Sequence, residues 1–169
     1  MILLLKNLLF TVLVPGTVTV LVPCWILGRS TGGAVPGALR GLAVAVGAAG
    51  VAVYAWCVVD FAVVGRGTPA PVDPPKSLVV RGLYRHSRNP MYVGVLGVLA
   101  AETLWFGSWA LLAWAATMTL AFNLFIRLYE EPTLRRLFGA AYADYCARVP
   151  RWLPWRGAAA PEGPRASVP

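Results

Sequence analysis

Charged residues are scarce in this chain. Only 13% of its 169 residues carry a charge, against about 25% in a typical soluble domain. Histidine is nearly absent as well, since His86 stands alone. A metal site built from histidines is therefore excluded, and we expect no bound metal. A serine-hydrolase triad would have to use His86 as its base, but the chain has no Gly-x-Ser-x-Gly motif.

Cysteine and glycine motifs are missing too. The three cysteines, Cys24, Cys57 and Cys146, are odd in number and widely separated, so they predict neither a disulfide framework nor a Cys-x-x-Cys metal site. A Gly-x-Gly-x-x-Gly sequence opening a βαβ unit is absent, and no segment is rich in strand-forming patterns. These absences exclude a dinucleotide-binding α/β domain and favour an all-α fold.

Long apolar runs dominate what is present, since 58% of the residues are hydrophobic. A helix needs about 20 predominantly apolar residues to cross a bilayer. Four segments approach or meet that length, and we predict a polytopic membrane protein with four transmembrane helices in two antiparallel pairs. The predicted spans are residues 8–27, 41–64, 91–106 and 109–127. We interpret the first as a retained span rather than a signal peptide, bent at Pro15 and with Pro23 as a candidate end.

The basic residues predict an orientation. With both termini in the cytoplasm, every Lys and Arg except Arg29 and Arg40 lies on the cytoplasmic side, as the positive-inside rule requires. The net charge of +8 is thus explained by membrane topology. We therefore expect the lipid bilayer, with its anionic headgroups, as the partner of this charge and no nucleic acid.

The chain after the last span reads as a cytoplasmic helical segment over residues 131–148. Pro132 suits its first turn, and apolar residues recur at three- and four-residue spacings from Leu134 to Tyr145. This pattern predicts an interfacial helix, with Gly139 as a weak point or break. The Pro-rich residues 65–75 predict a surface loop. We expect one membrane domain over residues 1–156 and a disordered tail over 157–169.

Polar residues flank the second predicted hairpin on both sides. Asn89 and Pro90 suit the cap and first turn of the third span, and helix capping alone would explain them. Glu130 and Glu131 are harder to explain, because negative charge is unfavourable at a helix C-terminus. These carboxylates need compensation from nearby arginines or from a bound cation. Ionisable groups at a bilayer edge are candidates for a functional site.

Four motifs in this region occur in a familiar order. They are Gly-Leu-Tyr-Arg at 82–85, Arg-Asn-Pro-Met-Tyr-Val-Gly at 88–94, Glu-Glu at 130–131, and Phe-Gly at 138–139 followed by Tyr142, Tyr145 and Val-Pro-Arg at 149–151. In this C-terminal half the chain resembles the isoprenylcysteine carboxyl methyltransferases and the related phospholipid methyltransferases. Asn89 stands where the family usually has histidine, which weakens any role for a histidine base there.

The resemblance implies an S-adenosylmethionine-dependent membrane methyltransferase. It places the cofactor pocket at the cytoplasmic end of the last spans, capped by the C-terminal segment. The residues that match the motifs and that we expect to bind the cofactor are Arg88, Asn89, Pro90, Tyr92, Gly94, Glu130 and Glu131. Among these, we expect Glu131 to be the most sensitive to substitution. Arg151 and Tyr145 are the expected catalytic residues at the substrate mouth.

The expected acceptor is a lipophilic small molecule or a prenylcysteine-like carboxylate at the cytoplasmic membrane face. Methyl transfer is an in-line displacement, so alignment and exclusion of water matter more than acid–base chemistry. Two alternatives stay open at this point: an NADPH-dependent membrane reductase related to the sterol reductases, and a non-enzymatic membrane scaffold. The sequence does not decide between O-, N- and S-methylation, the oligomeric state, or the role of Asp60.

Overall fold

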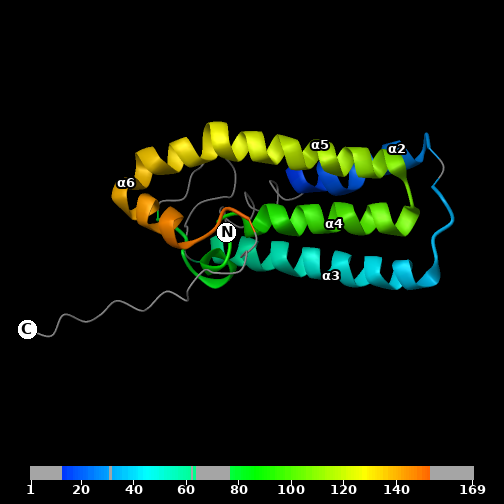
Figure 1. Ribbon diagram of the computed structural model, residues 1–169, viewed down its shortest axis with the longest axis horizontal. Helices are drawn as coiled ribbons and strands as arrows, with labels where there is room; N and C mark the ends of the chain where they lie inside the picture. Colours follow the sequence, from blue (N-terminus) through cyan, green and yellow to red (C-terminus); the bar gives the residue numbers. More distant parts are fainter. Residues whose placement is uncertain (1–12, 31, 62, 64–76, 153–169) are drawn as a thin grey trace, which may run out of the picture.

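The computed structural model describes residues 13–30, 32–61, 63 and 77–152. Regular structure in this part of the chain is entirely helical (Figure 1). The first helix covers Leu13–Leu27 and contains a π-helical stretch, η1 (Thr17–Leu21), followed by α2 (Val22–Leu27). The remaining elements are α3 (Gly37–Asp60), the 3₁₀ turn η3 (Gly82–Arg85), α4 (Pro90–Phe106), α5 (Trp109–Phe125), the π-helical η4 (Ile126–Glu130) and α6 (Glu131–Arg148).

The helix positions follow the predicted segments closely. The third and fourth predicted spans correspond to α4 and α5, and the predicted cytoplasmic helix over residues 131–148 coincides with α6. The second begins four residues earlier than predicted, at Gly37, because Pro36 ends the preceding extended segment. The predicted loop at 65–75 and the predicted tail at 157–169 lie outside the described residues.

Two helical stretches are long and apolar enough to cross a membrane: Gly37–Asp60 and the continuous stretch Trp109–Arg148. In their most hydrophobic windows only 17% and 11% of the residues are buried inside the protein. A core helix of a soluble protein would instead be mostly buried. Leu13–Leu27 and Pro90–Phe106 are shorter apolar helices.

The most intimate helix packing joins α3 to α4, which lie side by side (Figure 1). Gly50 and Gly94 face each other at this interface. A Cβ atom added to Gly94 would lie 2.8 Å from the Gly50 carbonyl oxygen, and one added to Gly50 would lie 2.7 Å from the Gly94 carbonyl oxygen. The two backbones therefore approach as closely as they do only because neither residue has a side chain.

The predicted pairing of the first two spans is wrong. The first helix packs against α5 and α4 rather than forming a pair with α3 (Figure 1). Apolar runs indicate which segments form helices but not which helices pack together, so the sequence pattern could not give this pairing. The first helix also continues through Pro23 and ends at Leu27.

The helix that begins at Trp109 runs without interruption into η4 and α6. Gly139 breaks it, with a φ of 50° and a ψ of −124° that other residues rarely adopt, as the sequence indicated. Beyond Gly139 the chain turns back toward the end of the bundle (Figure 1). The apolar face of α6 packs there on the protein: Tyr142, Tyr145 and Val149 are buried together, against Leu78, Leu134, Phe138 and Cys146.

Candidate functional site

The start of α4 is tied to the segment that follows α6. The backbone N–H of Arg88 donates to the carbonyl of Pro150 (2.9 Å), and the Asn89 side-chain amide donates to the carbonyl of Arg151 (2.9 Å). Asn89 makes no side-chain cap to α4, so its amide serves the C-terminal segment rather than the helix it precedes. Helix capping does not explain this asparagine.

Glu131 lies at the centre of an ion-pair cluster that we call the clasp, formed by Arg88, Glu131 and Arg151. Arg88 Nη1 donates to Glu131 Oε1 (3.1 Å), while Arg151 donates through Nε to Oε1 (2.8 Å) and through Nη2 to Oε2 (3.0 Å). Burial opposes ionisation of Glu131, but the hydrogen bond from Arg151 and the charges of both arginines outweigh it and lower the pKa of this carboxyl. Glu131 is therefore an ionised, fully engaged carboxylate.

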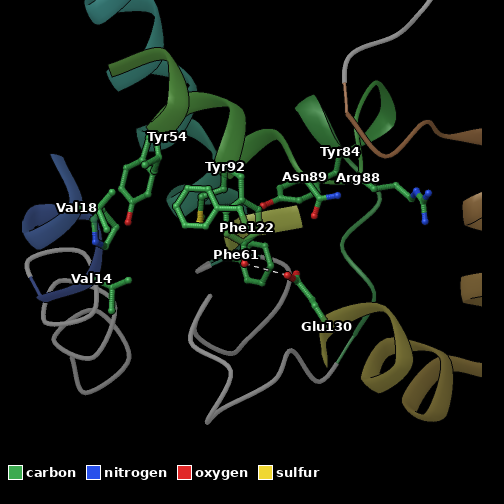
Figure 2. Close-up of a pocket in the computed structure, with 13 residues that line it drawn as sticks. Val14, Val18, Tyr54, Phe61, Tyr84, Arg88, Asn89, Tyr92, Phe122 and Glu130 are labelled. Carbon is green, nitrogen blue, oxygen red and sulfur yellow. Dashed lines mark hydrogen bonds between the residues drawn. The ribbon is translucent and has the colours of Figure 1, made fainter. Parts of the chain in front are cut away.

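Glu130 faces a different environment, a cavity between the helix ends (Figure 2). Its Oε2 accepts a hydrogen bond from the Tyr92 hydroxyl at 3.0 Å. Burial raises the pKa of Glu130, opposed by the Tyr92 hydrogen bond and assisted by the negative charge of Glu131. Adjacent residues in a helix point about 100° apart, so one carboxylate can line the cavity while the other closes the clasp.

The cavity has about 600 Å³ of empty space, including its open mouth. Side chains from the first helix, α3, the η3 turn, α4, α5 and η4 line it. They are Val14, Pro15, Val18, Tyr54, Phe61, Tyr84, Arg88, Asn89, Met91, Tyr92, Val95, Phe122 and Glu130. The cavity thus lies at the end of the bundle where α4 begins and α5 gives way to η4.

Polar and apolar lining residues occupy opposite ends of this cavity. Arg88, Asn89 and Glu130 lie toward one end, whereas Val14 and Val18 of the first helix lie at the other (Figure 2). Tyr92 lies between them, its ring against that of Phe122 with centroids 4.9 Å apart. A molecule with a polar part and a lipophilic part would find matching surfaces within this one space.

Arg88 contributes to both the clasp and the cavity. Its Nη1 is engaged by Glu131 and by Cys146 Sγ (2.8 Å), whereas its Nε is buried and has no hydrogen-bond partner among the described residues. A buried donor without a partner is costly. The Arg88 head group points away from Tyr92 and Glu130 (Figure 2), so Arg88 contributes positive charge to this end of the cavity while the clasp holds its guanidinium.

The sequence-predicted residues divide into two groups. Arg88, Asn89, Tyr92 and Glu130 line the cavity, and Pro90 begins α4 beside them. Gly94 does not line it, because it lies against α3 in the helix interface described above. Its close approach is to another backbone rather than to a ligand.

The expected catalytic residues, Arg151 and Tyr145, do not line the cavity either. Arg151 belongs to the clasp, and the hydrogen bond to Glu131 raises its pKa. Tyr145 is buried and donates its hydroxyl to the Tyr84 carbonyl (2.7 Å). Burial raises the pKa of Tyr145, which keeps the hydroxyl protonated as a donor. In this structure both residues hold the C-terminal segment in place.

The cavity also includes aromatic residues that the sequence reading did not single out as site residues: Tyr54, Phe61, Tyr84 and Phe122. Tyr84 lay within a recognised motif, at 82–85, and was the one that could have been found. The others sit in apolar runs, where an aromatic residue carries no signal of its own. Their role depends on how helices pack, which the pattern of one chain does not specify.

Asp60, whose role the sequence left open, ends α3 in a buried position. Its Oδ1 pairs with Arg81 Nε at 3.2 Å. This ion pair fastens the segment that leads into η3, and η3 carries Tyr84 into the cavity wall. Asp60 therefore lies outside the cavity and supports one of its walls.

Comparison with known proteins gives one match. The sequence profile of a family described as phospholipid methyltransferase matches residues 42–141, more than half of the 169 residues. No curated protein and no solved structure matches the chain. The matched region includes most of α3, all of α4 and α5, and the site residues Tyr92, Glu130 and Glu131.

Proposed function

We propose that the cavity beside the clasp is the site of methyl transfer in this chain, which belongs to the phospholipid methyltransferase family. A member of this family is an integral membrane methyltransferase that uses S-adenosylmethionine and methylates a lipid. Membership decides against the reductase and the scaffold. The observation that carries the proposal is the two-ended cavity, with Glu130 and Arg88 toward one end and apolar side chains of the first helix at the other.

We assign the polar end to the cofactor. S-adenosylmethionine supplies an electrophilic methyl group on a sulfonium, and it carries an amino group, hydroxyls and a carboxylate. Glu130 offers a carboxylate to the cationic and hydroxyl groups, and Arg88 places a positive charge at the same end, where it favours the cofactor carboxylate. Asn89 and Tyr92 complete this end. These residues match the charges and hydrogen-bonding groups of the cofactor, and Glu131 and Arg151 stay outside the cavity lining.

Glu131, Arg151 and Tyr145 act in this proposal as positioning residues. Glu131 holds the Arg88 side chain at the cavity wall, and Arg151 holds Glu131. Tyr145 fastens α6 to η3, and Asn89 fastens the segment after α6 to the start of α4. Their contribution is alignment, on which a displacement reaction depends strongly.

We assign the apolar end to the acceptor, a lipophilic molecule that enters from the bilayer. A prenylcysteine-like carboxylate and a phospholipid headgroup both satisfy this description. A carboxylate acceptor needs no general base, whereas an amine acceptor must first lose a proton, and Glu130 is the carboxylate within reach of the cavity.

The proposed topology has four membrane spans: the first helix, α3, α4 and α5. Both termini and the cavity lie on the cytoplasmic side, because the arginines around the site follow the positive-inside rule. The shorter apolar helices, Leu13–Leu27 and Pro90–Phe106, cross the bilayer packed against the two longer ones.

The proposal is tested with purified protein, S-adenosylmethionine labelled on its methyl group and a total lipid extract. We expect label in a lipid product from the wild type, and identification of that product gives the acceptor and the methylated atom. Glu130→Gln, which keeps the shape and removes the charge, should lower methyl transfer at least tenfold (roughly the effect of a lost charge-assisted contact). Asp144→Asn, on the exposed side of α6, is the matched control. Full activity in Glu130→Gln would contradict the assignment.

A further inference from the structure

One peptide carbonyl in the first helix has no partner within its own helix. Val22 donates its N–H to Thr17, five residues back, which is the π-helical pattern of η1. The next residue, Pro23, has no N–H to donate. The carbonyl of Val18 therefore receives a bond neither from Val22 nor from residue 23. An unbonded carbonyl is costly in a hydrocarbon environment.

Trp114 of α5 supplies the missing donor. Its indole Nε1 donates to the Val18 carbonyl at 3.0 Å, across 96 residues of sequence. This contact is a side-chain hydrogen bond that joins the first helix directly to α5. It fixes both the height and the rotation of the first helix against α5, because the carbonyl and the indole N–H must align.

The residue held in this way is also a cavity residue. The Val18 side chain lines the apolar end together with Val14, away from Glu130 (Figure 2). Other lining side chains, Tyr54, Val95 and Phe122, come from three other helices. The width of the cavity at this end therefore depends on where the Trp114 contact places the first helix.

We propose that the hydrogen bond between Trp114 and the Val18 carbonyl makes the first helix the element that selects acceptors by the size of their lipophilic part. Trp114 is a specificity-determining positioning residue, and Val18 is the side chain that meets the acceptor. The inference rests on the proposed function, in which the apolar end holds the acceptor. The cofactor end shares no residue with this contact.

The first test compares Trp114→Phe with Trp109→Phe, a control on the same helix whose side chain is 82% exposed. Labelled S-adenosylmethionine and a total lipid extract are supplied to each, and the acyl composition of the labelled products is determined by mass spectrometry. We expect Trp114→Phe to broaden the range of acceptors, to raise KM for the acceptor and to leave KM for S-adenosylmethionine unchanged. Trp109→Phe should match the wild type.

A second test changes the wall itself. Val18→Phe narrows the apolar end without touching the hydrogen bond, and we expect the bulkiest acceptors to lose about tenfold in kcat/KM relative to the smallest, the scale of a steric change in an apolar pocket. If the product profiles of Val18→Phe and Trp114→Phe are both those of the wild type, the inference is overturned.

A third test needs no turnover. Pro23→Ala restores an N–H at residue 23 and lets the first helix satisfy its own carbonyls as a regular α-helix. Trp114→Phe should then lower the thermal unfolding temperature in the wild-type background and have little effect in the Pro23→Ala background. Equal effects in both backgrounds would overturn the proposed contact. If the wild type yields no labelled lipid, the proposed function fails, and this thermal cycle still decides whether Trp114 holds the first helix.

Discussion

Glu130 and Glu131 are neighbours in the chain but have opposite surroundings. Glu130 lies in the cavity wall beside Tyr92, and Glu131 lies between Arg88 and Arg151. A sequence motif can bring both residues to the right region, because the hairpin of α4 and α5 returns residue 130 to the level of residue 89. It does not say which carboxylate faces which way, since that depends on the rotation of the helix.

Glu130 should make the affinity for S-adenosylmethionine depend on pH. Burial raises the pKa of Glu130 above its usual range, and only the ionised form attracts a cationic sulfonium. The affinity for S-adenosylmethionine should therefore rise as pH increases through this raised pKa and then level off. Titration calorimetry on detergent-solubilised protein at a series of pH values measures it. Glu130→Gln should remove this dependence, and a wild-type profile parallel to that of the variant would refute the assignment.

The clasp around Glu131 should contribute measurably to the stability of the folded protein. Glu131→Gln breaks the clasp and leaves two buried or half-buried arginines without their counter-charge, so we expect a loss of about 2–3 kcal/mol in unfolding free energy. Because the pKa of Glu131 is lower when folded, the clasp is at full strength above the unfolded value of about 4.3 and weakens as pH falls through the folded value. The difference in thermal stability between wild type and variant should therefore shrink in acid.

Asp144→Asn is the control for this second measurement, because Asp144 is exposed on the same helix. It should change stability by less than about 0.5 kcal/mol. A Glu131→Gln variant as stable as Asp144→Asn would show that the clasp contributes nothing. The sequence had marked Glu131 as the most sensitive cofactor residue; that prediction stays untested, and the geometry favours Glu130 for the direct contact.

At the scale of elements, most helices were predictable and their partners were not. Uninterrupted apolar runs and the Pro90 and Pro132 positions locate α3 to α6 well. The side-by-side packing of α3 and α4 depends on Gly50 meeting Gly94 across two helices, and many other glycines lie in the same apolar runs. Nothing in the order of residues distinguishes these two. The position of the first helix against α5 depends in the same way on a single contact from Trp114.

Two glycines of α4, Gly94 and Gly97, should differ in how well they tolerate alanine. Gly94→Ala would place its Cβ 2.8 Å from the Gly50 carbonyl oxygen, whereas the nearest atom to a Cβ on Gly97 would be 3.4 Å away. Gly94→Ala should therefore push α4 from α3, cost about 1–3 kcal/mol and displace Tyr92 from Glu130. Gly97→Ala should be tolerated, since alanine favours helix. Thermal unfolding and methyl transfer measure both, and equal behaviour of the two variants would contradict the packing.

The predicted orientation of the whole molecule places the cavity and α6 on the cytoplasmic side of the membrane and the connection after α2 on the opposite side. The connection after α2 carries Arg29, whereas α6 carries Arg136, and both side chains are exposed. In a background without the native cysteines, Arg29→Cys should react with an impermeant maleimide from outside intact cells. Arg136→Cys should react only after the cells are opened. The reverse labelling pattern would show that the orientation is inverted. Labelling of both positions from the same side would contradict the three crossings, α3, α4 and α5, that the proposed topology places between them.

The clasp joins residues that leave the ribosome far apart in time. Arg88 emerges early in the second half of synthesis, while Arg151 follows only after two more apolar helices have been delivered to the membrane. A nascent chain that stops short of Arg151 already has every wall of the cavity but lacks the lock on Glu131. The clasp, and with it the attachment of the segment after α6 to the start of α4, can therefore form only after both helices of the hairpin are in place.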